Sequence, residues 1–249
     1  MTVGDQGQRN KASFRLGVPT ENLVELFSIG NAWRDFLDFE AEFREALAYV
    51  PLRESHLQVW SHKFGKILDQ VGSAVDSFLW VAAKEGGLFR DNALRDKEKL
   101  NIVDYCQILE PVYHLSTAQV IAYDGPAHYG PFTPFEAFGK MLASEQKIEW
   151  WWKAYQSYKH NRYSESAEAT LSNTLQALAG LFLLNVLHKE NQRWLIEKEV
   201  IARQNPMGYV MLALNLSGSR FGSTLPNVRA RRELFVHEFR FDRKAAGTS

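Results

Sequence analysis

Apolar side chains recur at steps of three and four residues in four stretches of the chain, and this period predicts four amphipathic helices. We expect the first helix over residues 31–49, ended by Pro51, because proline pushes the residue before it out of the α region. We expect the second helix over residues 55–84, with Gly86 and Gly87 directly after it as a left-handed cap.

The second pair of helices is expected after the middle of the chain, over residues 144–160 or 144–162 and over residues 166–188. Ser166 is the expected N-cap of the last helix, and His188 suits the negative end of its dipole. Apolar residues cover this helix almost all round, which is typical of a helix at the centre of a bundle. Two pairs of long helices predict a mainly α protein built as a four-helix bundle.

An insert over about residues 86–143 separates the two helix pairs and lacks their long helical period. We expect it to hold a short helix ended by Pro111, a stretch of β-forming residues, a turn, and a proline-stiffened loop whose aromatic rings pack on the bundle. These four features are assigned, in that order, to residues 97–109, 112–123, 124–126 and 129–135.

The C-terminal segment, residues 206–249, shows the period of two that is typical of a strand, with Phe235 and His237 on the same face. We expect a small antiparallel sheet that joins this extended segment to the insert. The chain is thereby divided into a flexible N-terminal tail over residues 1–30, a helical bundle with its insert over residues 31–205, and the extended segment that packs on the bundle.

The chain has 29 basic and 29 acidic residues among 249, so its formal charge is zero and any site for a polyanion has to be local. Its single cysteine, Cys106, excludes an internal disulfide framework and is typical of a protein in a reducing compartment. The longest apolar stretch, residues 175–187, is shorter than the roughly 20 residues of a membrane-spanning helix. We therefore expect a cytoplasmic protein with no membrane segment.

The motifs that hold cofactors are missing from the sequence. There is neither a G-x-x-x-x-G-K-[ST] loop nor a G-x-G-x-x-G turn, and the seven histidines include no H-x-x-x-H pair. One cysteine cannot build a thiolate metal site. We expect neither a metal ion nor an organic cofactor.

Residues 150–162, with the sequence WWWKAYQSYKHNR, hold five aromatic rings, three cations and one histidine. On a helix, Lys153 and His160 lie on one side, with Gln156 between them. Cleavage of RNA by its own 2′-hydroxyl needs a proton acceptor and a cation for the charged phosphorane, and His160 with Lys153 could supply both. Arg162 would point away from them unless the helix ends near His160. The alternative is an ordinary amphipathic helix whose polar side faces solvent.

Asp69 and Asp76 are seven residues apart on the second predicted helix and therefore share one face of it. One of the two carboxylates could orient the imidazole of His160, as a carboxylate orients a catalytic histidine, or pair with Arg162. The alternative is that this face is only exposed to solvent.

The run W-K-A-Y-Q-S-Y-K-H-N-R at residues 152–162, followed by an Ala- and Leu-rich stretch at 169–179, resembles bacterial proteins of the HEPN superfamily. These proteins carry a Lys-His-x-Arg sequence just before their last helix, and residues 72–78 also look like a helix of that group. The resemblance covers about residues 31–190 without the insert. It implies a compact helical bundle, a homodimer and, in many members, a metal-independent ribonuclease of a defence or toxin–antitoxin system.

The catalytic members of the superfamily have an arginine shortly before the histidine, and this chain departs from that pattern. The corresponding window holds Lys153, Ala154 and Tyr155. Lysine keeps the charge but lacks the bidentate fork that suits phosphate. His160 remains the position that matches the family's histidine, and the resemblance also includes members that have lost catalysis.

A second arginine–histidine spacing occurs near the C-terminus, where Arg231 or Arg232 precedes His237. Short motifs of this kind also arise by chance, and this one falls in a predicted strand. Arg229, Arg231 and Arg232 are a better candidate for contacts with phosphate. The alternative is that these charges protect the edge of a sheet.

Two functional hypotheses follow. The favoured one is a HEPN-like, non-catalytic interaction and dimerisation module in defence or stress response, whose Trp- and Tyr-rich helix packs against a protein partner or a second copy. The alternative is a metal-independent ribonuclease or RNA-binding, toxin-like protein in which His160 is the general acid/base and Lys153 or Arg162 contacts phosphate.

Overall fold

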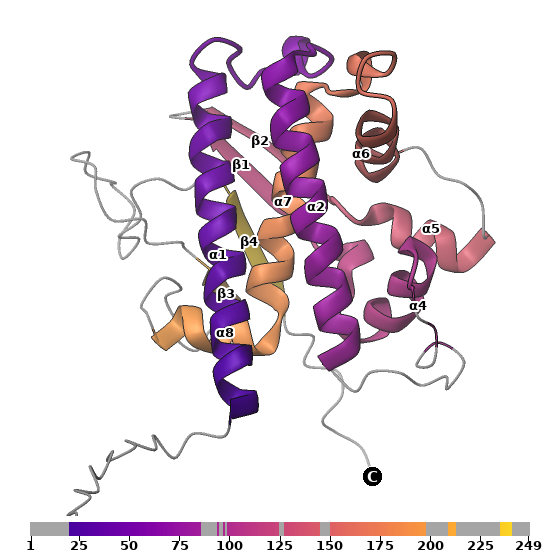
Figure 1. The fold of residues 1–249 in the computed structure, drawn as a ribbon. Helices are drawn as coiled ribbons and strands as arrows, with labels where there is room; N and C mark the ends of the chain where they lie inside the picture. The colour runs from indigo at the N-terminus through magenta and orange to yellow at the C-terminus, as the bar shows by residue number, and fades with distance from the viewer. Residues whose placement is uncertain are drawn as a thin grey trace, which may run out of the picture.

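The computed structural model describes residues 20–85, 94, 97, 99–124, 127–144, 150–197, 209–212 and 235–240. These residues form a mainly α fold, as the sequence predicts (Figure 1). The elements in chain order are α1 (Thr20–Leu47), η1 (Glu54–His56), α2 (His62–Glu85), α4 (Ile102–Tyr113), η2 (Leu115–Thr117), β1 (Val120–Asp124), β2 (Ala127–Phe132), α5 (Glu136–Ser144), α6 (Trp151–His160), η3 (Ser166–Glu168), α7 (Leu171–Leu187), α8 (Lys189–Glu197), β3 (Tyr209–Leu212) and β4 (Phe235–Arg240).

The four helices expected from the periodicity are present as α1, α2, α6 and α7, and α2 contacts the other three. In Figure 1, α1 and α2 lie side by side in front of α7, and α6 lies beside α2. The helices α4 and α5 of the insert contact each other, and α4 also contacts α2. The described residues therefore form a helical bundle that carries the insert on one side.

Helix α7 is the centre of the fold. Thirteen of its 17 residues are buried, because α1, α2 and α6 pack around it and β4 also contacts it. A fully buried leucine contributes roughly 1.5–3 kcal/mol relative to an exposed one, so this leucine-rich helix supplies a large part of the core. Its burial explains why its sequence is apolar almost all round.

The connection between α1 and α2 is hydrogen-bonded to the start of α7. The backbone carbonyls of Val59 and Leu57 accept hydrogen bonds from the N–H groups of Leu171 at 2.8 Å and Ser172 at 2.9 Å. The first N–H groups of a helix have no partner within that helix, and these bonds satisfy two of them. The Thr170 side chain accepts from a third and caps the helix.

This pairing corrects two predictions. The helix expected over residues 55–84 is wrong before His62, because Trp60 instead forms a β-bridge with Thr170. The expected N-cap Ser166 is also wrong: it begins a 3-10 turn, and Thr170 takes the capping position. In both cases a contact between distant segments sets the boundary.

Helix α1 begins at Thr20, so the predicted tail is wrong over residues 20–30. The apolar period continues through Leu23, Leu26 and Phe27, and it extends the helix toward the N-terminus. Residues 1–19 lie outside the described part of the chain.

Pro111 lies inside α4 and does not end it, contrary to the prediction. The missing N–H of proline costs one hydrogen bond, but Pro111 is close to the end of the helix and the chain continues to Tyr113. The helix ends where His114 adopts a left-handed conformation with φ of 49° and donates its N–H to the Glu110 carbonyl. Asn101 caps the other end with its side chain.

The sheet has the strand order β2-β1-β4-β3, and its pairings are antiparallel. Because β1 and β2 belong to the insert and β4 to the C-terminal segment, the predicted sheet between these two regions is confirmed. The β stretch expected from residue 112 begins only at Val120, and β2 includes residues expected in a loop. The loop was expected to pack aromatic rings on the bundle, and the ring of Phe135 is fully buried there.

Two glycines of α2 set the distance at which α6 packs against it. Gly65 and Gly72 are seven residues apart on one face, and the rings of Tyr158 and Tyr155 occupy the space where their side chains would lie. A Cβ atom at Gly72 would overlap the inner carbons of the Tyr155 ring, which is fully buried. Helix α6 therefore reaches this position only because both residues lack a side chain.

We expect Gly72→Ala to destabilise the fold, although alanine favours a helix over glycine by about 1 kcal/mol. Overpacking against an immobile ring costs about 1–3 kcal/mol and outweighs this gain. Urea unfolding followed by circular dichroism measures the difference. Gly139→Ala in α5 is the control, because its Cβ would meet only the small side chain of Ser116, at 3.3 Å, and should cost less stability than Gly72→Ala. Equal stabilisation of both variants would contradict the proposed close packing.

Candidate functional site

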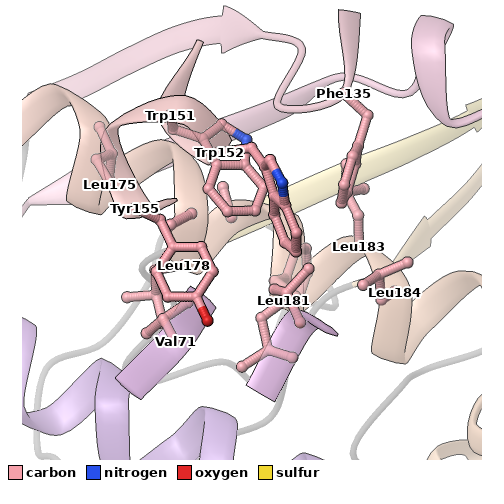
Figure 2. Packing of buried hydrophobic residues seen from close by; sticks show 14 of the residues in the cluster. Val71, Phe135, Trp151, Trp152, Tyr155, Leu175, Leu178, Leu181, Leu183 and Leu184 are labelled. Carbon is pink, nitrogen blue, oxygen red and sulfur yellow. The ribbon is translucent and has the colours of Figure 1, made fainter. Parts of the chain in front are cut away.

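Helix α6 turns its aromatic face toward the core. Trp151 and Tyr155 are fully buried and Tyr158 nearly so. Figure 2 shows Trp151, Trp152 and Tyr155 gathered over the leucines of α7, with Phe135 beside them. The indole N–H of Trp151 also donates a hydrogen bond of 2.7 Å to a backbone carbonyl of the insert. These rings are therefore core residues and not the exposed contact surface that the interaction hypothesis assigned to them.

The opposite face of α6 and its C-terminal end carry exposed polar side chains. Lys153, Lys159 and His160 are exposed, and the helix ends at His160, so its predicted extension to Arg162 is wrong. Residues 145–149, expected to begin this helix, lie outside the described residues. Lys153 and His160 share a face but start about 10 Å apart along the axis, at 1.5 Å per residue.

Arg162 follows the end of the helix and turns toward α2. Its Nη2 atom donates to Oδ2 of Asp69 at 2.6 Å, and its guanidinium lies 5.4 Å from the centre of the Tyr158 ring. The sequence left open whether Asp69 or Asp76 would pair with Arg162, and Asp69 is the partner. The ion pair and the ring together hold the arginine next to the end of α6.

Asp76 has a different role from the one considered for it. It is half-buried, it accepts a hydrogen bond from the hydroxyl of Tyr105, and the ammonium of Lys159 lies close to it. Burial raises the pKa of Asp76 above its usual value, while Lys159 and Tyr105 act in the opposite direction. Burial, followed by the nearby carboxylates, raises the pKa of Tyr105 to about 12. In the described part of the chain, no hydrogen bond or ion pair joins Asp76 to His160.

Lys159 connects these groups, although it was not among the predicted site residues. Its ammonium donates to the hydroxyl of Tyr155 at 2.9 Å, and that hydroxyl lies 3.2 Å from Oγ of Ser73. The bond to Tyr155 raises the pKa of Lys159, burial opposes this, and the charges of Asp76 and Asp69 add to the increase. The glycine spacing on α2 is the sequence signal that would have predicted this close packing of α6.

The remaining predicted site residues are not brought into this cluster. Gln156 is half-exposed on α6, and no hydrogen bond links its side chain to the described residues. Arg229, Arg231 and Arg232 lie outside the described residues, so the expected phosphate contacts stay a prediction. His237 lies in β4, so its predicted position in a strand is confirmed.

Cys106 is fully buried and its Sγ donates to the Phe138 carbonyl at 3.2 Å. Burial, with a contribution from Glu110, raises the pKa of this thiol to about 12, so it is not an activated nucleophile. The described residues contain no cluster of three side chains that could bind a metal ion. They also contain no helix with the length and apolar character needed to cross a membrane.

No protein-family model, no curated protein and no solved structure matches this chain at a significant level. Its function therefore has to be inferred from the arrangement of its own residues.

We expect Tyr105→Phe to destabilise the protein more at about pH 7 than at about pH 3. The Tyr105 hydroxyl favours the ionised form of Asp76, so its loss raises the pKa of Asp76 further. When a carboxyl has a raised pKa in the folded state, the protein loses stability as the pH rises through that pKa. Because Tyr105→Phe raises the pKa of Asp76 further, the variant should lose more stability than the wild type. The loss at neutral pH should be about 1.5–3 kcal/mol, the range for a hydrogen bond to a charged group.

Urea unfolding of both proteins at the two pH values measures this difference. In an Asp76→Asn background, Tyr105→Phe should cost the same at both pH values, because residue 76, the acceptor of the Tyr105 hydrogen bond, no longer titrates. A pH dependence that persists in this background would show that another group causes it.

Proposed function

We propose that this protein is an interaction module that binds RNA through the surface at the end of α6. We call this surface the α6-end surface and define it by Lys159, His160, Arg162 and Tyr163. The observation that carries the proposal is Tyr163, whose side chain is 97% exposed directly after three cationic or titratable side chains.

Single-stranded nucleic acids are bound by cations that contact the backbone and by aromatic rings on which bases stack. An isolated, nearly fully exposed tyrosine next to Arg162 and Lys159 supplies both kinds of group within a few residues. The formal charge of the whole chain is zero, so any attraction for RNA has to come from local cations such as Lys159 and Arg162.

The α6-end surface is supported by a rigid scaffold. Tyr155 and Tyr158 anchor α6 in the glycine positions of α2, and Asp69 holds the guanidinium of Arg162. A side chain that is already oriented loses less conformational entropy when it binds a ligand. This support favours binding by groups that do not have to be ordered first.

The resemblance of the Lys159-His160-Asn161-Arg162 sequence to the HEPN superfamily supports RNA as the partner. The same resemblance suggests a homodimer and a role in defence or stress response as part of this proposal. Lysine stands in the window where catalytic members have arginine, and this favours binding without cleavage as the main function.

Replacing Tyr163 by alanine should weaken binding to a fluorescein-labelled, single-stranded RNA. Loss of one base-stacking ring costs about 1–3 kcal/mol, so we expect a rise in Kd of roughly five- to 150-fold. Fluorescence anisotropy at fixed low salt measures the change. Tyr163 is so exposed that its removal should leave thermal unfolding unchanged.

Tyr49→Ala is the matched control, because this tyrosine is 84% exposed and lies on the connection after α1. It should bind RNA as the wild type does. If both variants bind equally well, or if the wild type does not bind RNA, the assignment of the α6-end surface is wrong.

Metal-independent cleavage of RNA is the second candidate function. The specific observation that favours it is that His160 is exposed and that its ring has no hydrogen-bond partner within the described residues. Its imidazole would take the proton of a 2′-hydroxyl, whose oxygen attacks the adjacent phosphorus. The bond from phosphorus to the 5′ oxygen then breaks, and that oxygen takes a proton from solvent. The products are a 2′,3′-cyclic phosphate and a 5′-hydroxyl.

Incubation of labelled RNA with a chelator tests this candidate. If cleavage occurs, His160→Ala should slow it by about 10²–10⁴-fold, the usual contribution of a general acid/base. His62→Ala, which also removes an exposed histidine, should leave the rate unchanged. Cleavage that survives His160→Ala would exclude His160, and RNA binding without cleavage would leave the module non-catalytic.

A further inference from the structure

A groove of about 480 Å³ lies between α1 and α2. Its apolar lining includes Phe39 of α1, Phe78 of α2 and Leu181 of α7. His188, buried between the rings of Phe78 and Tyr113, closes the end near α8.

Small side chains of both α1 and α2 line the groove. Ala32 of α1 lies across from Ala74 and Ser77 of α2. Farther along the same pair of helices, the rings of Phe43 and Phe64 are 6.0 Å apart and fill the interface. The two helices are therefore tightly packed at one end and leave an open apolar space at the other.

The exposed lining of the groove is mainly apolar, and one charged group stands among its polar side chains. Among the described lining residues, Asp35 carries the only carboxylate, and there is no lysine or arginine. Gln70 and Ser73 add uncharged hydrogen-bonding groups at the rim. A mainly apolar lining with a few fixed polar groups is the usual composition of a site for a small molecule.

We propose that this groove binds a small organic cation with a hydrophobic body. The body would lie on Phe78 and Leu181, and the cationic group would pair with the carboxylate of Asp35. The volume is within the range of about 300–1,000 Å³ for sites that bind molecules of drug-like size.

The state of Asp35 agrees with such a ligand. Burial of part of this side chain and the nearby charge of Asp38 raise the pKa of Asp35, and Arg34 only partly offsets them. The raised pKa means that the surroundings favour the ionised form of Asp35, an exposed side chain, less than water does, and a nearby positive charge would reverse this. An ammonium group in the groove would provide that charge at a place where an apolar body is also buried.

The test uses three probes of the same shape and different charge: phenylbutylamine, phenylbutanol and phenylbutyrate. Titration of each into the full-length protein is followed by two-dimensional ¹H–¹⁵N NMR. We expect the amine to bind most tightly, the alcohol more weakly and the carboxylate weakest. Chemical-shift changes for the amine should centre on Ala32, Ala74 and Leu181.

Asp35→Asn should lower the affinity for the amine roughly tenfold, as expected for the loss of one charge-assisted hydrogen bond, and leave the alcohol unchanged. Asp38→Asn is the matched control: it removes a neighbouring carboxylate that does not line the groove and should have a smaller effect. Ala74→Trp should fill the groove and prevent binding of all three probes. Ser77→Phe repeats that test at an exposed position if the tryptophan variant does not fold.

Equal affinity for the amine and the alcohol would overturn the choice of a cation. Binding that persists in a folded groove-filling variant would place the ligand elsewhere. No binding of any probe to the wild type would also overturn the proposal, since it is the result expected if a segment of this chain or a second copy occupies the groove.

Discussion

The position of α6 depends on Gly65 and Gly72, where any side chain would collide with the rings of Tyr158 and Tyr155. Helix α2 thus has two positions without side chains, and the tyrosine rings of α6 occupy the space beside them. The tyrosine rings gain burial, and the backbones of the two helices come close together. Every proposed function of the α6-end surface relies on this contact, because it fixes the end of α6 relative to the carboxylates of α2.

The same close approach explains the charges at this junction. With α6 so near to α2, Asp69 reaches Arg162 and Asp76 lies close to Lys159. Asp76 is half-buried, and it avoids the cost of an unpaired buried carboxylate through Lys159 and the hydroxyl of Tyr105. These pairs orient the cations, while the exposed part of the surface keeps Tyr163 and His160 in contact with solvent.

The sequence by itself determined the helical class, the central place of α7 and the strand character of the C-terminal segment. These features follow from periods of 3.6 and 2 residues, which depend only on the local geometry of the backbone. The same reasoning placed Lys153 and His160 on one exposed face of a helix, as the structure shows.

Only the tertiary structure decided where the helices end and which charges meet. Helix α2 starts late because the carbonyls of Leu57 and Val59 satisfy the first N–H groups of α7, more than 100 residues later in the chain. The pairing of Arg162 with Asp69 spans 93 residues and follows from the glycine contact between α2 and α6. Periodicity shows which face of an element is apolar. Segments that are distant in sequence decide what packs on that face and where the element begins and ends. For that reason the chain alone predicted the elements of the site, and packing selected the pairs within it.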